Sequence, residues 1–343
     1  MSQIAQVRAA LAAIAQKYSD TRICHCQMEA EVVVDGVCTL SGSVLDGETL
    51  TAVVEPLVEQ FPDLAFATAA VQVLRAIPEQ FLQVATNVTG LYANPSFLAE
   101  MVSQLVQGMR VERLQEQGKW VYVRQEDGYL GWVYGSYLGK TAVFPPTHLV
   151  SSPVALLHQA PDETALLVGR VLAGTAVFTA QTHNTWTQLT LPDGTAGWVH
   201  SPHLRSLAAL PQTGSAQRQQ LVQDAAQFIG VPYRWGGCTS LGLDCSGLAQ
   251  LTHRLVGVIL PRDADMQYKA GRSVEPPFQP GDLLFFGNQS QTAGRAITHV
   301  GISLGEWRML HASIARNGVY EDDAQAVAHL RQQFVGARTF LRE

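Results

Sequence analysis

The sequence repeats itself at an offset of 66 residues, and the two copies align without a gap. Tryptophans, Asp-Gly pairs and Gly-Trp pairs recur in the same order, as Trp120, Asp127-Gly128 and Gly131-Trp132 and again as Trp186, Asp193-Gly194 and Gly197-Trp198. Each copy predicts a strand, an Asp-Gly turn and a second strand, because Asp-Gly between alternating apolar residues is a strong hairpin signal. The repeat therefore predicts two small β domains in tandem, at residues 81–145 and 146–210.

The repeated pattern resembles the bacterial SH3-like domains. In both copies a strand with a tryptophan is followed by a turn, a Gly-Trp pair and a closing leucine, Leu138 or Leu204. The resemblance extends over about residues 81–209 and implies that each copy forms a small β-barrel. Trp120 and Trp186 are predicted to fill the two barrel cores.

Residues 1–80 predict a separate α/β module. Its first helix is amphipathic, with one apolar face made of Ile4, Val7, Leu11 and Ile14. The segment has no basic leader, so we interpret it as a helix and not as a signal peptide, and we expect a cytoplasmic protein. Two strands around Asp35-Gly36, a helix over 47–60 and a strand over 65–74 follow. This order of helices and strands, with its alternating valines around Asp35-Gly36, resembles the BON-type module, for which we predict a structural or interaction role.

Composition narrows the class of protein further. The chain has 343 residues, 47% of them hydrophobic, which predicts several globular domains. Its net charge of −6 gives no basic surface for nucleic acid or an anionic membrane, and no apolar run is long enough to span a bilayer. The five cysteines are sparse and odd in number, which argues against a disulfide framework. The Cys24-His25-Cys26 cluster lacks the second cysteine pair of a zinc site, so we expect no metal or cofactor.

The segment 242–251, GLDCSGLAQL, places Cys245 at the start of a predicted helix. The apolar stripe of this helix consists of Leu248, Leu251, Leu255 and Val256, and Asp244 is a good N-cap residue. Unpaired N–H groups and the helix dipole favour an anion at that position, so we expect a lowered thiol pKa. Cys245 is therefore a candidate nucleophile, although a buried thiol without chemistry remains the alternative on this segment alone.

A thiol nucleophile needs a histidine base and a group that orients the histidine. His299 begins the predicted strand HVGISL, and His311 ends the predicted strand WRMLHA. If the hairpin turns at Gly305, midway between them, the two histidines are directly opposed across the strands. Val300, Ile302 and Leu304 would then face the core, while His299 faces the other way.

Five segments in order resemble the NlpC-type cysteine peptidases of bacterial cell-wall metabolism, namely VPYRWGGCTSLGLDCSGLAQL, LPRDADMQ, PGDLLFF, THVGISLG and LHAS. The resemblance covers about residues 216–343 and implies a papain-like α+β domain at 211–343. It implies that Cys245 is the nucleophile, His299 the general base and later acid, and His311 the residue that orients His299. The N–H of Cys245 and the hydroxyl of Tyr233 are the implied oxyanion donors. The whole chain is thus expected to be a multidomain α+β protein.

Tandem SH3-like domains before an NlpC-type domain resemble the γ-D-glutamyl-L-diamino acid endopeptidases of peptidoglycan recycling. The resemblance implies hydrolysis of the bond between D-glutamate and the diamino acid in free stem peptides such as L-alanyl-γ-D-glutamyl-diaminopimelate. It also implies that Asp244, Ser246 and Asp263 contact the peptide, while we interpret Arg262 as holding a loop through an ion pair. Asp244 can serve both as helix cap and as peptide contact.

In these recycling enzymes a tyrosine and an acid of the first SH3-like domain hold the free amino group of the substrate. Tyr129 lies at the implied tyrosine position, and the second copy has Thr195 there. Relatives tend to carry a glutamate directly after the glycine that corresponds to Gly108, where this chain has Met109. Because a buried ammonium without an anionic partner is costly, we expect another acid to serve. Glu112 and Asp127 are the candidates that lie near in sequence.

Three alternative functions remain open at this point. A non-catalytic wall-binding protein would not need the Cys245, His299 and His311 set. An acyltransferase or amidase of the permuted type would place its histidine before its cysteine, and here the cysteine comes first. A secreted lysin would use the SH3-like domains to target intact cell wall and would require export.

Overall fold

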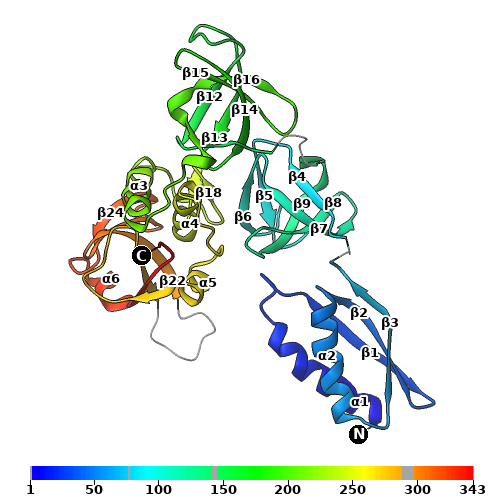
Figure 1. Ribbon diagram of the computed structural model, residues 1–343. Coiled ribbons are helices and arrows are strands. Elements are labelled where there is room, and N and C mark those ends of the chain that lie inside the picture. The colour runs from blue at the N-terminus through cyan, green and yellow to red at the C-terminus, as the bar shows by residue number, and fades with distance from the viewer. Residues whose placement is uncertain (1, 76–77, 141–144, 288–296, 343) are drawn as a thin grey trace. The chain divides into compact units, whose positions relative to one another are not determined.

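The computed structural model describes residues 2–75, 78–140, 145–287 and 297–342 (Figure 1). Contacts between Cα atoms divide the chain into two compact units. One unit consists of Met1–Phe81 and Glu112–Trp132, and the other of Leu82–Val111 and Val133–Glu343. All predicted catalytic residues lie in the second unit. Among the described helices, none is both long and apolar enough to cross a membrane.

The N-terminal module is a three-stranded sheet with two helices. Its elements are α1 (Gln3–Ala15), β1 (Cys26–Val34), β2 (Val37–Val44), α2 (Gly47–Gln60) and β3 (Ala65–Val73). Asp35 and Gly36 both have positive φ, so the β1–β2 turn is the tight hairpin that Asp-Gly favours. Strands β2 and β3 pair in parallel across α2, and the apolar face of α1 is buried against the sheet at Val7 and Leu11.

Two seven-stranded sheets occupy the middle of the chain. The first has the order β10-β4-β7-β8-β9-β5-β6 and the second the order β13-β12-β16-β15-β14-β11-β17. The first consists of β4 (Phe81–Val84), β5 (Val88–Tyr92), β6 (Met101–Val106), β7 (Arg110–Gln117), β8 (Trp120–Arg124), β9 (Leu130–Tyr134) and β10 (Leu138–Gly139). The second consists of β11 (His148–Val150), β12 (Val154–His158), β13 (Leu167–Leu172), β14 (Ala176–His183), β15 (Trp186–Thr190), β16 (Ala196–His200) and β17 (Leu204–Ser206).

The repeat in the sequence is a repeat in the structure. Strands β5 to β9 of the first sheet recur as β12 to β16 at the same 66-residue offset, with identical lengths. The glycines at matching turns share the left-handed conformation, with φ of 84° at Gly108 and 82° at Gly174, and 89° at Gly128 and 87° at Gly194. Only glycine adopts this conformation without steric cost, which explains why these positions match in both copies.

The C-terminal domain consists of a six-stranded antiparallel sheet with helices. The sheet has the order β20-β25-β21-β22-β23-β24. Its strands are β20 (Arg272–Val274), β21 (Leu283–Gly287), β22 (Ile297–Gly305), β23 (Arg308–Ser313), β24 (Gly318–Asp323) and β25 (Phe334–Thr339). The remaining elements are α3 (Gly214–Ala226), β18 (Cys238–Thr239), β19 (Gly242–Leu243), α4 (Cys245–Leu255), α5 (Ala264–Ala270) and α6 (Ala328–Gln333).

Each face of this sheet has its own apolar cluster. Helix α4 packs against β22 and β23, where Val300 and Ile302 are buried with Leu248. Helix α6 contributes Leu330 to the other cluster, which includes Met309. Side chains of successive strand residues point to opposite faces, so the predicted orientation of Val300 and Ile302 toward the core is confirmed.

Candidate active site

Cys245 is the first residue of α4. Asp244 precedes it in extended conformation, and the Asp244 side chain accepts a hydrogen bond from the N–H of Gly247 at 2.7 Å. The predicted N-cap is therefore confirmed. A Cβ atom at Gly247 would lie 2.0 Å from the carbonyl oxygen of Gly237, so only glycine lets the preceding loop pass this close to the helix. As the first helical residue, Cys245 does not use its N–H in the hydrogen bonds of the helix itself.

A buried ion pair supports the start of α4. Arg262 is 1% exposed, and its guanidinium lies 2.5 Å from Oδ2 and 3.2 Å from Oδ1 of Asp244. The same guanidinium donates to the hydroxyl oxygens of Ser246 at 2.9 Å and Ser103 at 3.2 Å. The prediction that Arg262 forms an ion pair is confirmed, and its partner is the residue that caps the nucleophile's helix.

Strand β6 of the first SH3-like sheet contacts the loop that precedes Cys245. The side-chain oxygen of Gln104 accepts hydrogen bonds from the N–H of Cys238 at 3.1 Å and from the hydroxyl of Thr239 at 3.2 Å. A Cβ atom at Gly236 would lie 2.2 Å from the carbonyl oxygen of Met101, so the two segments approach as closely as backbones allow. Residues of β6 therefore help to position the loop that precedes Cys245.

The two predicted histidines are brought together, although not in the predicted register. Nε2 of His299 lies 2.7 Å from Nδ1 of His311. The expectation that they are directly opposed is wrong, because Ile302 pairs with Leu310, so that His311 faces Gly301 instead. The register shifts because the turn is formed by Glu306 and Trp307, with Glu306 at φ 55°, and because β22 is irregular before Gly305. The rings therefore meet diagonally, which long side chains in a sheet can do.

A third group, which the sequence analysis missed, completes this row of side chains. Nε2 of His311 lies 2.9 Å from Oδ2 of Asp322 on β24, and Arg316 donates to Oδ1 of the same carboxylate at 2.8 Å. His311 pairs with Tyr320, two residues before Asp322, so the contact again runs diagonally between strands. His311 is buried, and the Asp322 side chain is 20% exposed.

The sulfur of Cys245 contacts strand β22 at Val300. The backbone N–H of Val300, the residue after His299, hydrogen-bonds to this sulfur, as does the N–H of Ser246, and both bonds lower the thiol pKa. Burial and the Asp244 carboxylate outweigh them and raise the pKa of Cys245 to about 12. The expectation of a lowered pKa is therefore wrong, because a helix terminus cannot compensate for the loss of solvent around a thiolate.

The histidines are neutral in this environment. Burial lowers the pKa of His299 to about 3, and the neighbouring His311 lowers it further. Burial also lowers the pKa of His311, although the hydrogen bond to Asp322 opposes that effect. The resting site thus pairs a neutral thiol with a neutral imidazole, which can accept the proton as the sulfur attacks.

The other predicted site residues occupy different surroundings. Tyr233 is half-buried and close enough to Cys245 for a thiolate there to raise the tyrosine pKa, after the larger effect of burial. Ser246 is buried and donates to Asp244. Asp263 precedes α5 and lies 4.0 Å from the Arg262 guanidinium. Tyr129, which is 3% exposed, lies in the other compact unit. Their roles toward substrate stay predictions.

Of the two acids expected to replace the glutamate of the relatives, Glu112 is already engaged. It is 3% exposed, and its carboxylate lies 2.9 Å from the Arg75 guanidinium and 3.6 Å from that of Arg124. Glu112 is therefore the weaker of the two candidates for holding a substrate ammonium, because two arginines already neutralise it. Asp127 accepts a hydrogen bond from the N–H of Tyr129 within the turn.

The described residues contain no group of three or more acidic, histidine or cysteine side chains that could hold a metal. All five cysteines are free thiols, and the His25 ring, in the cluster considered above, hydrogen-bonds to Ser43 at 2.7 Å.

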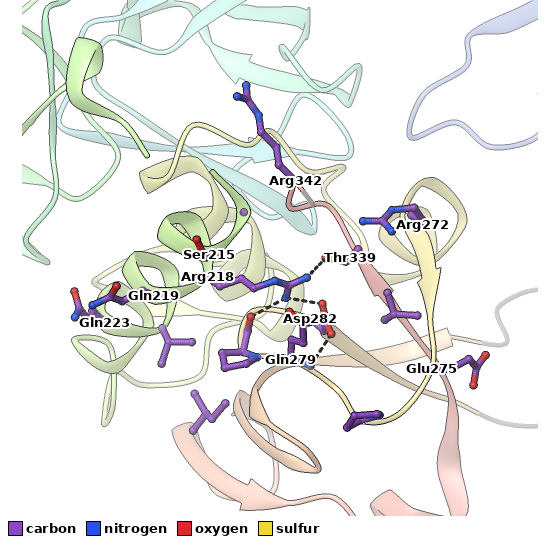
Figure 2. A pocket seen from close by; sticks show the side chains of 16 residues that line it. Ser215, Arg218, Gln219, Gln223, Arg272, Glu275, Gln279, Asp282, Thr339 and Arg342 are labelled. Atoms are coloured by element: carbon purple, nitrogen blue, oxygen red, sulfur yellow. Dashed lines mark hydrogen bonds and ion pairs between the residues drawn. The ribbon is translucent and has the colours of Figure 1, made fainter. Parts of the chain in front are cut away.

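A separate pocket of about 970 Å³ lies between α3 and the segments around β20 and β21 (Figure 2). At its centre Arg218 donates to the carboxylate of Asp282 at 2.8 Å and to Thr339 at 3.3 Å. The described residues that line it do not include Cys245, His299 or His311. This pocket is therefore not the candidate active site.

Three family profiles match the chain. The profile of the NlpC/P60 family matches residues 230–339, and two profiles of the bacterial SH3 domain match residues 87–139 and 151–206. The matched segments contain the Cys245, His299 and His311 set and the two copies of the repeat. The expected multidomain α+β architecture is confirmed.

Curated relatives share most of this architecture. Dipeptidyl-peptidase 6 of Lysinibacillus sphaericus is 30% identical over 246 residues, which cover 68% of this chain and 87% of that protein. The γ-D-glutamyl-L-lysine dipeptidyl-peptidase of Bacillus subtilis (strain 168) is 31% identical over 224 residues, which cover 61% of this chain and 71% of that protein. A crystal structure of an NlpC/P60 family protein from Bacillus cereus ATCC 10987 matches in fold, with a TM-score of 0.66 at 21% identity over 76% of this chain and 100% of that one.

Proposed function

The chain belongs to the NlpC/P60 family of cysteine peptidases, and we propose that it hydrolyses the bond between γ-D-glutamate and the following diamino acid in peptidoglycan stem peptides. The observation that carries the proposal is the site itself, in which the N–H groups of Val300 and Ser246 hydrogen-bond to the Cys245 sulfur and His311 contacts His299, the neighbour of Val300, at 2.7 Å. Two relatives named above are dipeptidyl-peptidases, and one is named for the γ-D-glutamyl-L-lysine bond.

We propose further that the substrates are short free peptides that begin with L-alanyl-γ-D-glutamate, as in cell-wall recycling in the cytoplasm. A dipeptidyl-peptidase removes two residues from a free N-terminus, and L-alanyl-γ-D-glutamate is such a pair. The relatives' names support this preference over the intact wall that a secreted lysin would attack. Such a peptide carries a free ammonium, which requires an anionic partner where it is desolvated.

We propose that Glu100 supplies this anionic partner. It lies directly before β6, and its Oε1 accepts a hydrogen bond from the indole N–H of Trp235 at 2.8 Å. Trp235 follows Tyr233 by two residues in the loop that leads to Cys245. Glu100 is thus an acid of the first SH3-like sheet that contacts the catalytic loop within the same compact unit.

Mass spectrometry of cleavage products tests the substrate. The purified protein is incubated with L-Ala-γ-D-Glu-diaminopimelate, with its N-acetylated form and with intact sacculi, and Cys245→Ala serves as the inactive control. We expect release of L-Ala-γ-D-Glu from the free tripeptide, and no cleavage of the N-acetylated form or of intact sacculi. Equal cleavage of the acetylated peptide and of sacculi would overturn the recycling proposal in favour of a lysin.

Kinetics of Glu100→Gln test the ammonium partner. We expect the variant to raise KM for the free tripeptide about tenfold or more, because a charge-assisted hydrogen bond is lost. Glu116→Gln is the matched control, since Glu116 forms an exposed ion pair with Arg113 at 3.2 Å in the same SH3-like sheet. An unchanged KM in Glu100→Gln would remove this residue from the proposal.

A further inference from the structure

Burial lowers the pKa of His311, so its ring is neutral, and the contacts between His299, His311 and Asp322 then permit one arrangement of protons. A carboxylate only accepts hydrogen bonds, so the 2.9 Å contact with Asp322 requires that His311 carry its proton on Nε2. In the neutral ring Nδ1 of His311 is then an acceptor. The 2.7 Å contact with His299 therefore requires that Nε2 of His299 donate to it.

The same reasoning assigns the remaining nitrogen of His299. With the proton on Nε2, the Nδ1 atom of the neutral ring holds a lone pair. We propose that Asp322 is a positioning residue that fixes the tautomers of both histidines, so that Nδ1 of His299 takes the proton of the Cys245 thiol. This inference rests on the proposed peptidase function and adds to it the atom that acts as base and the residue that selects it.

The proton balance follows directly. The S–H bond of Cys245 breaks, its proton passes to Nδ1 of His299, and the electron pair stays on sulfur and attacks the carbonyl carbon of the substrate. When the C–N bond of the resulting intermediate breaks, the proton on Nδ1 passes to the leaving amine. Nε2 of His299 stays protonated throughout, held by His311, so that Asp322 need not gain a proton.

Arg316 determines how Asp322 presents its two oxygens. Its guanidinium donates to Oδ1 at 2.8 Å and lies 4.2 Å from the centre of the Tyr320 ring. In an Asp322→Asn variant Arg316 would require the amide oxygen as its acceptor. The amide nitrogen would then face His311 and donate to its Nε2, so the proton of the His311 ring must sit on Nδ1 instead. Nδ1 of His311 would donate to Nε2 of His299, and the proton of the His299 ring would then sit on its own Nδ1, the atom that is needed as the base.

This reversal predicts an unusual order of variants. We expect Asp322→Asn to lower kcat about a hundredfold to ten-thousandfold, because the favoured tautomer is the inactive one. Asp322→Ala, which imposes no tautomer, should lose less, and KM should stay nearly constant in both. The double variant Asp322→Asn/Arg316→Met should recover at least tenfold relative to Asp322→Asn, because the amide can then turn its oxygen toward His311.

A matched control separates this effect from loss of charge. Glu321→Gln removes the same charge from the adjacent residue of β24, where Glu321 pairs with the exposed Arg308 at 2.7 Å. We expect its kcat to stay within about twofold of the parent. The proposal would be overturned if kcat of Asp322→Asn were no lower than kcat of Asp322→Ala, or if the double variant recovered no activity.

Nitrogen-15 spectra of the histidine rings test the tautomers without any substrate. They are recorded on Cys245→Ala protein, and signals are assigned with His299→Gln and His311→Gln variants. We expect both rings to carry their proton on Nε2 with Asp322 present and on Nδ1 in Asp322→Asn. A proton on Nδ1 of His299 while Asp322 is present would refute the inference. Correct tautomers in a protein that does not cleave stem peptides would instead refute the proposed substrate alone.

Discussion

Arg262→Met should destabilise the start of α4 far more than an ordinary surface substitution. The variant leaves the Asp244 carboxylate, which is 6% exposed, with three neutral donors, the N–H groups of Gly247 at 2.7 Å and Gly236 at 3.0 Å and the Ser246 hydroxyl at 3.1 Å. Removing one partner of a buried ion pair costs about 3–5 kcal/mol. A tenfold change in equilibrium corresponds to about 1.4 kcal/mol, so opening of the helix start should rise about a hundredfold to a few thousandfold.

Hydrogen exchange of α4 peptides, followed by mass spectrometry, measures this cost locally. A local readout is needed because a multidomain chain does not unfold in one step. Arg308→Met is the control, because Arg308 is 62% exposed and its ion pair with Glu321 lies at the surface, so its loss should cost under about 1 kcal/mol.

The double variant Arg262→Met/Asp244→Leu decides whether the charge is the cause. With the carboxylate gone, no buried charge remains uncompensated, and the residual cost should approach that of a lost helix cap, about 1 kcal/mol. The reasoning would be refuted if the free-energy cost in the double variant equalled the sum of the costs in Arg262→Met and Asp244→Leu measured separately. Parent-like exchange in Arg262→Met would refute it as well.

Three further predictions follow from groups in the same domain. Alkylation of Cys245 by iodoacetamide should be slow at pH 7 and rise through pH 9, because its pKa is raised to about 12 by burial; a rate already at its plateau at pH 7 would contradict this. Gly301→Ala should lower kcat about tenfold in peptide-cleavage assays, because its Cβ would lie 2.5 Å from Met309 Sδ and 3.4 Å from His311 Cβ, and Met309→Ala should restore much of the loss. Burial lowers the pKa of His253 to about 4, so the unfolded chain binds more protons between pH 4 and 6.5 and stability should fall by about 3 kcal/mol as the pH decreases through that window. The opening free energy of α4, measured by hydrogen exchange at several pH values, should depend less on pH in His253→Phe, and an unchanged dependence would exclude His253 as the cause.

The sequence predicted those features that depend on local chemistry. Asp35, Gly36 and Gly128 adopt the positive φ that the predicted Asp-Gly turns require, and helix α2 spans Gly47–Gln60 as expected. The cap at Asp244 was predictable because an aspartate side chain accepts a hydrogen bond from a free N–H of the first helical turn. Each of these features is encoded within a few residues.

Features set by long-range packing were not predicted. The register of His299 and His311 depends on an irregularity near Gly305 that no local pattern reveals. Asp322 contacts His311 only because β24 pairs with β23, and its segment, GVYEDD, has no catalytic signature. The pKa of Cys245 depends on burial, whereas the sequence shows only the helix terminus. Solvent exclusion is a property of the assembled domain and cannot be inferred from spacing.

The contacts of β6 bear on how such proteins can be recombined. Gln104 satisfies two donors of the loop before Cys245, and Ser103 accepts a hydrogen bond from the buried Arg262. A gene fusion that carries residues 211–343 alone would leave these donors buried without acceptors or open to water. We therefore expect that moving this peptidase domain to another protein keeps its stability only when Ser103 and Gln104 of β6 move with it.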